Sequence, residues 1–111
     1  MSVAIPWLLR RPGLGLTLRG GRDGQNRPIR FVHPTELPDP RPWLSGGALV
    51  LTTGLGLRPE EGADYVRRLV EAGVSALGFG TGLTHETIPS TVLATADALG
   101  LALIEVPYTT P

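Results

Sequence analysis

Residues 48–54 read ALVLTTG, four consecutive apolar residues followed by two threonines and a glycine. A short continuous apolar run is typical of a strand that is covered on both faces, as in the parallel sheets of α/β proteins. In such proteins the ligand sites lie just beyond the carboxyl ends of the strands. We therefore expect a buried strand over residues 48–51, with Thr52, Thr53 and Gly54 at a functional edge.

The next segment predicts a helix and a second strand. Residues 59–72 begin with proline and two glutamates, which favour the first turn of a helix. They end before Gly73, which suits the left-handed position that often follows a helix. The apolar side chains of this helix lie on one face, and residues 76–79 are expected to form the next strand. The face predicted to be buried comprises Val66, Leu69 and Val70.

The same order is then repeated. Residues 89–99 predict a second helix that ends before Gly100, and residues 101–106 predict the last strand. The tripeptide that begins at Thr53 recurs at Thr81, 28 positions later. The apolar stripe of the second helix is Val92, Leu93, Ala96 and Leu99. Such an echo is what two successive right-handed β-α crossovers produce. The predicted fold is therefore α/β, with a small, mainly parallel sheet, an N-terminal helix and two additional strands.

The first 45 residues supply those additional elements. Ser2 is expected to cap a short helix that carries Ile5, Leu8 and Leu9 on one face. Leu16 and Leu18 indicate a short strand. Residues 29–35 indicate another strand, with Ile29 and Phe31 on one face. Four prolines then hold the chain extended up to Trp43. Trp7 and Trp43 are expected to anchor the core, with a dimer surface as the alternative role.

Composition excludes several classes of function. The 111 residues suit one domain, and ten arginines balance ten acidic residues, so there is no basic surface for nucleic acid. Cysteine is absent from the sequence, which excludes disulfides, thiol catalysis and cysteine-ligated metals. The first residues do not have the pattern of a signal peptide, and no apolar run in the sequence is long enough to span a bilayer. We expect a cytoplasmic domain that by itself binds neither DNA nor a membrane.

Two turns form the candidate ligand site. Parallel neighbouring strands should bring Thr52, Thr53 and Gly54 next to a second turn, and their backbone N–H groups and hydroxyls suit a small polar or anionic ligand. The second turn consists of Gly80, Thr81 and Gly82. The alternative is that the glycines only supply the positive φ that tight turns need, while the threonines satisfy loose backbone groups.

Three further side chains are weaker candidates. Glu36 lies in the proline-rich segment, where it is expected to cover the site as a lid or to accept backbone hydrogen bonds. Arg30 and His33 are candidates for orienting an acidic or heterocyclic ring. Neither turn matches a phosphate-binding or dinucleotide-binding motif. His33 and His85 lack an accompanying cluster of acidic residues, so we expect no metal, no cofactor and no catalytic residue.

A series of motifs in fixed order resembles the N-terminal domain of PucR-like (purine catabolism regulator) bacterial transcription factors. The resemblance covers nearly the whole chain, and it departs from the family at Ala48, where glutamate is expected. The motifs that carry it are Glu36-Leu37, Asp39-Pro40, Trp43-Leu44, Gly46-Gly47, Leu49 to Gly54, Gly78 to Gly82 and Ile104 to Pro107.

The resemblance implies a regulatory role without catalysis. It implies a sensory domain over residues 1–107, with residues 108–111 beginning a linker to a helix-turn-helix that alone contacts DNA. The implied effector is a purine, a ureide or another nitrogen metabolite, and a weak homodimer is expected. Two alternatives remain open: a ligand-free dimerisation or interdomain module, and a nucleotide-recognising appendage of a ligase or kinase, on the basis of fold-level analogy.

Overall fold

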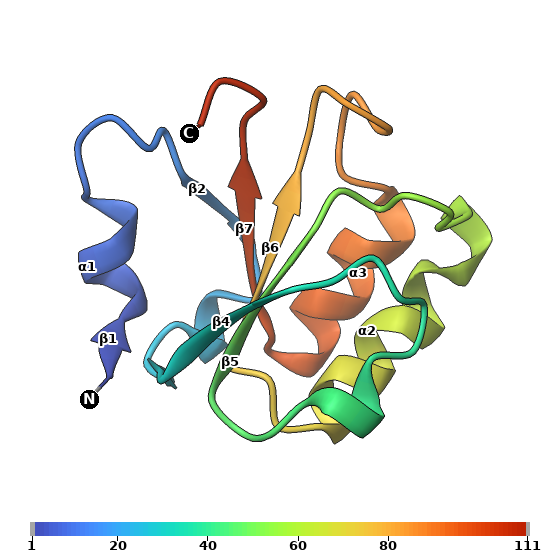
Figure 1. The fold of residues 1–111 in the computed structure, drawn as a ribbon, viewed down its shortest axis with the longest axis horizontal. Coiled ribbons are helices and arrows are strands. Elements are labelled where there is room, and N and C mark those ends of the chain that lie inside the picture. Colours follow the sequence, from blue (N-terminus) through green and yellow to red (C-terminus); the bar gives the residue numbers. More distant parts are fainter. Residues whose placement is uncertain (1, 111) are drawn as a thin grey trace.

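The computed structural model describes residues 2–110, which form a five-stranded sheet with helices on both faces (Figure 1). Four neighbouring strands are parallel, and the fifth is an antiparallel edge strand. In spatial order the strands are β2 (Thr17–Gly20), β7 (Ala102–Val106), β6 (Ala76–Gly80), β5 (Ala48–Thr52) and β4 (Phe31–Pro34). A separate antiparallel pair consists of β1 (Val3–Ala4) and β3 (Pro28–Ile29).

Two helices cover one face of the sheet and one short helix covers the other (Figure 1). On the first face lie α2 (Gly62–Glu71), which is preceded by the 3₁₀ turn η3 (Pro59–Glu61), and α3 (Ser90–Leu99). On the second face lies α1 (Ile5–Leu9). The predicted β-α-β-α-β run is confirmed, because β5, α2, β6, α3 and β7 follow one another with the expected bounds to within two or three residues.

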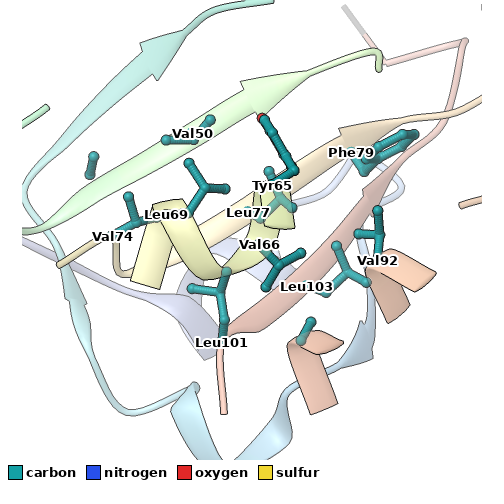
Figure 2. Packing of buried hydrophobic residues seen from close by; sticks show 12 residues of the cluster. Val50, Tyr65, Val66, Leu69, Val74, Leu77, Phe79, Val92, Leu101 and Leu103 are labelled. Carbon is teal, nitrogen blue, oxygen red and sulfur yellow. The ribbon is translucent and has the colours of Figure 1, made fainter. Parts of the chain in front are cut away.

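Alternation along each strand divides the core between the two faces. In β5, Ala48 and Val50 are fully buried against α2 and α3, while Leu49 belongs to the cluster around Ile5 of α1. Figure 2 shows the larger of these clusters, with Val66 and Leu69 of α2 directed at the sheet. Its members are Ala48, Val50, Tyr65, Val66, Leu69, Val74, Leu77, Phe79, Val92, Ala96, Leu101 and Leu103.

The first residues differ from the prediction. Ser2 does not cap α1; Ala4 holds the N-cap position and makes no side-chain hydrogen bond to the helix. Val3 and Ala4 pair with β3 as a strand, so the chain is extended where the capping turn was expected. Pro6 occupies the first turn of α1, where its missing N–H costs no helical hydrogen bond. The small antiparallel pair therefore sets where this helix begins.

The strand predicted over residues 29–35 is interrupted. Ile29 packs into the cluster on the α1 face, whereas Phe31 packs against the α2 and α3 cluster, so the prediction that they share a face is wrong. Between them the Arg30 N–H donates to the Gly47 carbonyl at 2.8 Å, where the chain passes from β3 to β4. This step between two sheets resets the alternation of side chains.

Neither tryptophan anchors the core. Trp7 is 45% exposed and Trp43 is 64% exposed, so that prediction is wrong. Trp7 instead lies under the Arg11 guanidinium, 4.1 Å from the ring centroid, as a cation–π pair. Leu99 is also 40% exposed, at the last residue of α3, so the buried stripe of that helix ends before it. The largest fully buried side chain in residues 2–110 is Phe79.

Candidate functional site

The carboxyl ends of β5 and β6 bring the two threonine-containing turns together. Thr52 pairs with Phe79 in parallel register, so Thr53 and Gly80 are adjacent as the two strands end. No group of three or more histidine, cysteine or acidic side chains arranged for a metal occurs in residues 2–110. The chemistry at this edge therefore rests on hydroxyl groups, backbone N–H groups and individual charged side chains.

A carboxylate of the chain itself occupies the first turn. Glu36 Oε1 accepts hydrogen bonds from Thr52 Oγ1 at 2.6 Å and from the Leu55 N–H at 3.3 Å. Its Oε2 accepts two more at 2.9 Å, from the backbone N–H and the Oγ1 of Thr53. Thr52 Oγ1 in turn accepts from the Gly54 N–H at 3.0 Å. The turn therefore binds an anion, and that anion is a side chain of the proline-rich segment.

These contacts hold Glu36 in its ionised form. Partial burial opposes ionisation, but the hydrogen bonds from Thr52, Thr53 and Leu55 outweigh it and keep the pKa of Glu36 below its usual value. A carboxylate has about four lone-pair sites, and four donors already occupy them. Glu36 therefore acts as a latch that fastens the proline-rich segment to the end of β5.

The second turn is closed in a similar way. Thr81 is buried, and its hydroxyl donates to Glu105 Oε2 at 2.8 Å, while Arg19 Nε donates to Oε1 of the same carboxylate at 2.7 Å. The hydrogen bonds from Thr81 and Arg19 lower the pKa of Glu105, against a smaller opposing effect of burial. Each turn thus directs a threonine hydroxyl at a glutamate from elsewhere in the chain.

His85 joins the two turns, which the sequence reasoning did not foresee. Its Nε2 lies 3.1 Å from the Gly54 carbonyl oxygen, and its own carbonyl accepts the Gly82 N–H at 2.8 Å. Its ring meets Phe79 edge-on, with centroids 5.7 Å apart. Gly54, at φ 73°, leaves the space that this packing needs. A lone histidine three residues after a Gly-Thr-Gly turn gives little signal in the sequence.

Two hollows flank the Glu36 latch. One, of about 200 Å³, lies between the proline-rich segment, the first turn and α2, and contains Tyr65 and Arg68 in its lining. The other, of about 220 Å³, lies between the two turns on the face opposite α2, and its lining includes Leu51, Thr53 and Gly80. Ligand pockets usually measure about 300–1,000 Å³, so both hollows are smaller than a usual ligand pocket and have room only for a small molecule.

Tyr65 brings an unpaired hydroxyl to the first hollow. The residue is 3% exposed, and its hydroxyl is the one buried side-chain polar atom in residues 2–110 without a hydrogen bond. Burial raises its pKa to about 12; the nearby Thr52 hydroxyl acts against this increase, and the charge of Glu36 adds to it. In Figure 2 the side chain extends from α2 toward β5, with its oxygen at the tip.

The two remaining candidates lie away from the carboxyl ends of the strands. Arg30 lies just before β4, at the amino ends of the parallel strands, where it lines a separate hollow with Gly46, Gly47 and Ser75. His33 lies within β4, opposite Val50, and is not part of the lining of either hollow beside Glu36. The fold therefore brings together Glu36 and both turns, and it leaves Arg30 and His33 outside that group.

The chain is thus an α/β domain in which each of the two strand-end turns directs a threonine hydroxyl at a carboxylate of the same chain. Residues 7–111 match the PucR: Purine catabolism regulatory protein-like family, and the chain belongs to that family. The resemblance inferred from the motifs is confirmed.

The chain is similar to two proteins whose names describe regulators. The chain is 28% identical over 92 residues to the Purine catabolism regulatory protein of Bacillus subtilis (strain 168), a match that covers 81% of this chain and 17% of the relative. It is 31% identical over 84 residues to the Transcriptional activator PmfR of Paenarthrobacter nicotinovorans, covering 74% of this chain and 17% of that protein. The chain thus spans about a sixth of the length of these relatives.

These matches identify the chain as a domain of PucR-family transcriptional regulators, and the relatives themselves are regulators and not enzymes. The alternative of an appendage to a ligase or kinase is therefore set aside. In the part of the chain that the structure describes, no helix is both long enough and apolar enough to cross a membrane.

Proposed function

We propose that this chain is the N-terminal sensory domain of a bacterial transcription regulator and that it binds a small-molecule effector at the carboxyl edge of its parallel strands. One observation carries the proposal: the Glu36 latch and both threonine turns meet at this edge, beside two small hollows. Effector binding there changes how the proline-rich segment is held, and this change is the signal passed to the rest of the regulator.

The name of one relative supports the choice of effector class. The name of one relative refers to purine catabolism, and the other is a transcriptional activator. A purine, a ureide or another nitrogen metabolite is therefore the proposed ligand of this cytoplasmic regulator, whose DNA contacts are made by a helix-turn-helix outside this chain. The residues proposed to form the site are Glu36, Thr52, Thr53, Gly54, Gly80, Thr81 and Gly82.

A thermal-shift screen of purines, ureides and amino acids tests this function. A ligand at 100 times its Kd stabilises the fold by about 2.7 kcal/mol, which is readily measured for a domain of this size. The combined variant Thr53→Val and Thr81→Val should weaken the binding of any ligand found. Thr95→Val is the matched control, because its hydroxyl donates to the Thr91 carbonyl within α3. Absence of any stabilising compound from these classes would argue against a sensory role.

A second candidate function is a ligand-free contact module. Each of the four parallel strands is followed by a loop that exposes a large apolar side chain, namely Leu37, Leu55, Leu83 and Tyr108, which are 46–69% exposed. Apolar groups gathered on one edge are typical of a contact surface. They support a weak homodimer, which light scattering at high micromolar concentration would detect as a mass above that of the monomer.

A further inference from the structure

The buried Tyr65 hydroxyl lies near Thr52 but makes no hydrogen bond within residues 2–110. Buried side-chain hydroxyls nearly always have a hydrogen-bond partner, because an unmade bond forfeits the hydration that the group had in water. Phenylalanine would fill the same space in the core around Val66 and Leu69 without that cost. A tyrosine at this position therefore indicates a partner that is not part of the chain.

The hollow that Tyr65 lines contains a second suitable donor. Arg68 lies one helical turn after Tyr65 on α2, and one of its terminal nitrogens donates to the Pro38 carbonyl at 3.1 Å. A guanidinium has five N–H donors, so others remain available to a ligand. Two donors that face the same small hollow favour an oxygen acceptor on the bound molecule.

The charges and the apolar lining narrow the ligand class further. Glu36 and Glu61 both line this hollow, and together they exceed the single positive charge of Arg68. An anion would therefore be repelled, and Glu36 has no lone pair left for a strongly donating cation. Leu37, Leu55 and Leu57 supply the apolar part of the lining. An uncharged molecule with a carbonyl oxygen and a compact apolar body fits this combination.

We propose that the hollow between α2 and the Glu36 latch is the effector site, and that Tyr65 and Arg68 donate to a carbonyl oxygen of a small uncharged ligand such as an amide. This assignment rests on the proposed sensory function. It places the effector on the α2 side of Glu36 and not in the space between the two turns. The ligand reaches the buried hydroxyl by displacing Leu37 and Leu55. Both are largely exposed and have little packing to lose.

Isobutyramide and isobutyrate are matched probes for this site. They have the same shape, and each carries an oxygen acceptor, but only isobutyrate is an anion. In a titration followed through backbone amide NMR signals, isobutyramide should shift the signals of Leu55, Gly56, Tyr65 and Arg68 at millimolar concentration, as expected for so small a molecule. Isobutyrate should bind about tenfold more weakly, because two carboxylates line the hollow.

Two tyrosine variants complete the test. Tyr65→Phe should weaken isobutyramide binding about tenfold by removing one hydrogen bond, while its amide spectrum and unfolding midpoint show that the domain remains folded. Tyr108→Phe is the matched control, since that residue is 69% exposed and is not part of the lining of this hollow, and it should leave binding unchanged.

Three results would overturn the assignment. If the shifts centre on Gly80, Thr81 and Gly82, the site lies between the turns, so the assignment fails while the sensory function stands. If Tyr65→Phe binds isobutyramide as tightly as the unmodified domain, the hydroxyl has no ligand role. If isobutyramide shifts no signal around the hollow, this site does not take such a ligand, whereas the sensory function is decided separately by the thermal-shift screen.

Discussion

Replacing Glu36 tests whether the latch holds the proline-rich segment onto the sheet. Its carboxylate accepts four hydrogen bonds from a turn that is 16 to 19 residues away in the sequence. Glu36→Gln keeps the length of the side chain but presents an NH₂ group to one set of donors. At least one of the two threonine residues then loses its acceptor.

The expected cost can be worked out from the burial of the donors. Thr52 is 6% exposed, so water cannot easily replace its hydrogen bond to the carboxylate. A hydrogen bond to a charged group contributes about 1.5–3 kcal/mol to stability. The other three bonds reach exposed donors, where water replaces the carboxylate, and together they add about 0.5 kcal/mol. We expect Glu36→Gln to lower the free energy of unfolding by about 2–3.5 kcal/mol at pH 7, measured by urea denaturation.

The pH dependence provides an independent check. Because the folded-state pKa of Glu36 lies below its usual value of 4.5, the latch stabilises the fold fully above that value. The stabilisation is lost as the pH falls through the folded-state pKa. The difference between the unmodified domain and Glu36→Gln should therefore be constant from pH 6 to 7 and shrink as the pH falls below about 4.5.

The exposed Glu86 supplies the control for this experiment. Glu86→Gln should change the free energy of unfolding by less than about 0.5 kcal/mol at every pH, as is usual for a surface substitution. The reasoning would be refuted if Glu36→Gln cost no more than Glu86→Gln, or if the cost grew as the pH fell. Either result would mean that the carboxylate is not held by the turn in solution.

Three further predictions concern the two threonine-containing turns and Trp43, and all are measured by urea denaturation. Gly54→Ala should cost about 2–4 kcal/mol, because its φ is 73° and an added Cβ would lie 2.6 Å from Phe79 Cζ; a cost below that of Gly56→Ala, where the added Cβ meets nothing within 4 Å, would contradict the packing. Thr81→Val should cost about 1–2 kcal/mol through the lost bond to Glu105, and an unchanged stability would contradict this contact. Trp43→Ala should change stability by less than about 0.5 kcal/mol, and a large loss would restore its role as a core anchor.

Periodic segments were predictable from the sequence, and steps between sheets were not. The strand β5 and the helices α2 and α3 follow from apolar patterns and from glycines that end each helix, which are local signals. The prediction of one continuous strand over residues 29–35 was wrong, because the residue pattern does not show that the chain passes from one sheet to the other at Arg30. The prediction for Trp7 failed because the size and hydrophobicity of a residue do not show which face of a helix is buried. The five-residue helix α1 buries Ile5 and leaves Trp7 partly exposed.

The candidate site was foreseen in outline only. Parallel topology was enough to expect that the turns at Thr53 and Thr81 would be neighbours, and Glu36 was expected to lie over them. The sequence did not predict that four donors would bind the Glu36 carboxylate. These contacts depend on the path of the proline-rich segment, and that segment has no periodic pattern from which its path could be predicted. The unpaired Tyr65 hydroxyl likewise depends on packing between α2 and β5, and Tyr65 was not part of the face predicted to be buried.

The Glu36 latch also has a consequence for selectivity. A side chain tethered to its own binding site is present there at an effective concentration on the order of millimolar or more, whatever the composition of the surroundings. Free carboxylates and phosphates must compete with this tethered anion before they can occupy the turn at Thr52 and Thr53. The domain is thereby insulated against the common anions of a cell, and only a molecule that gains contacts beyond those of a carboxylate can change how the segment is held.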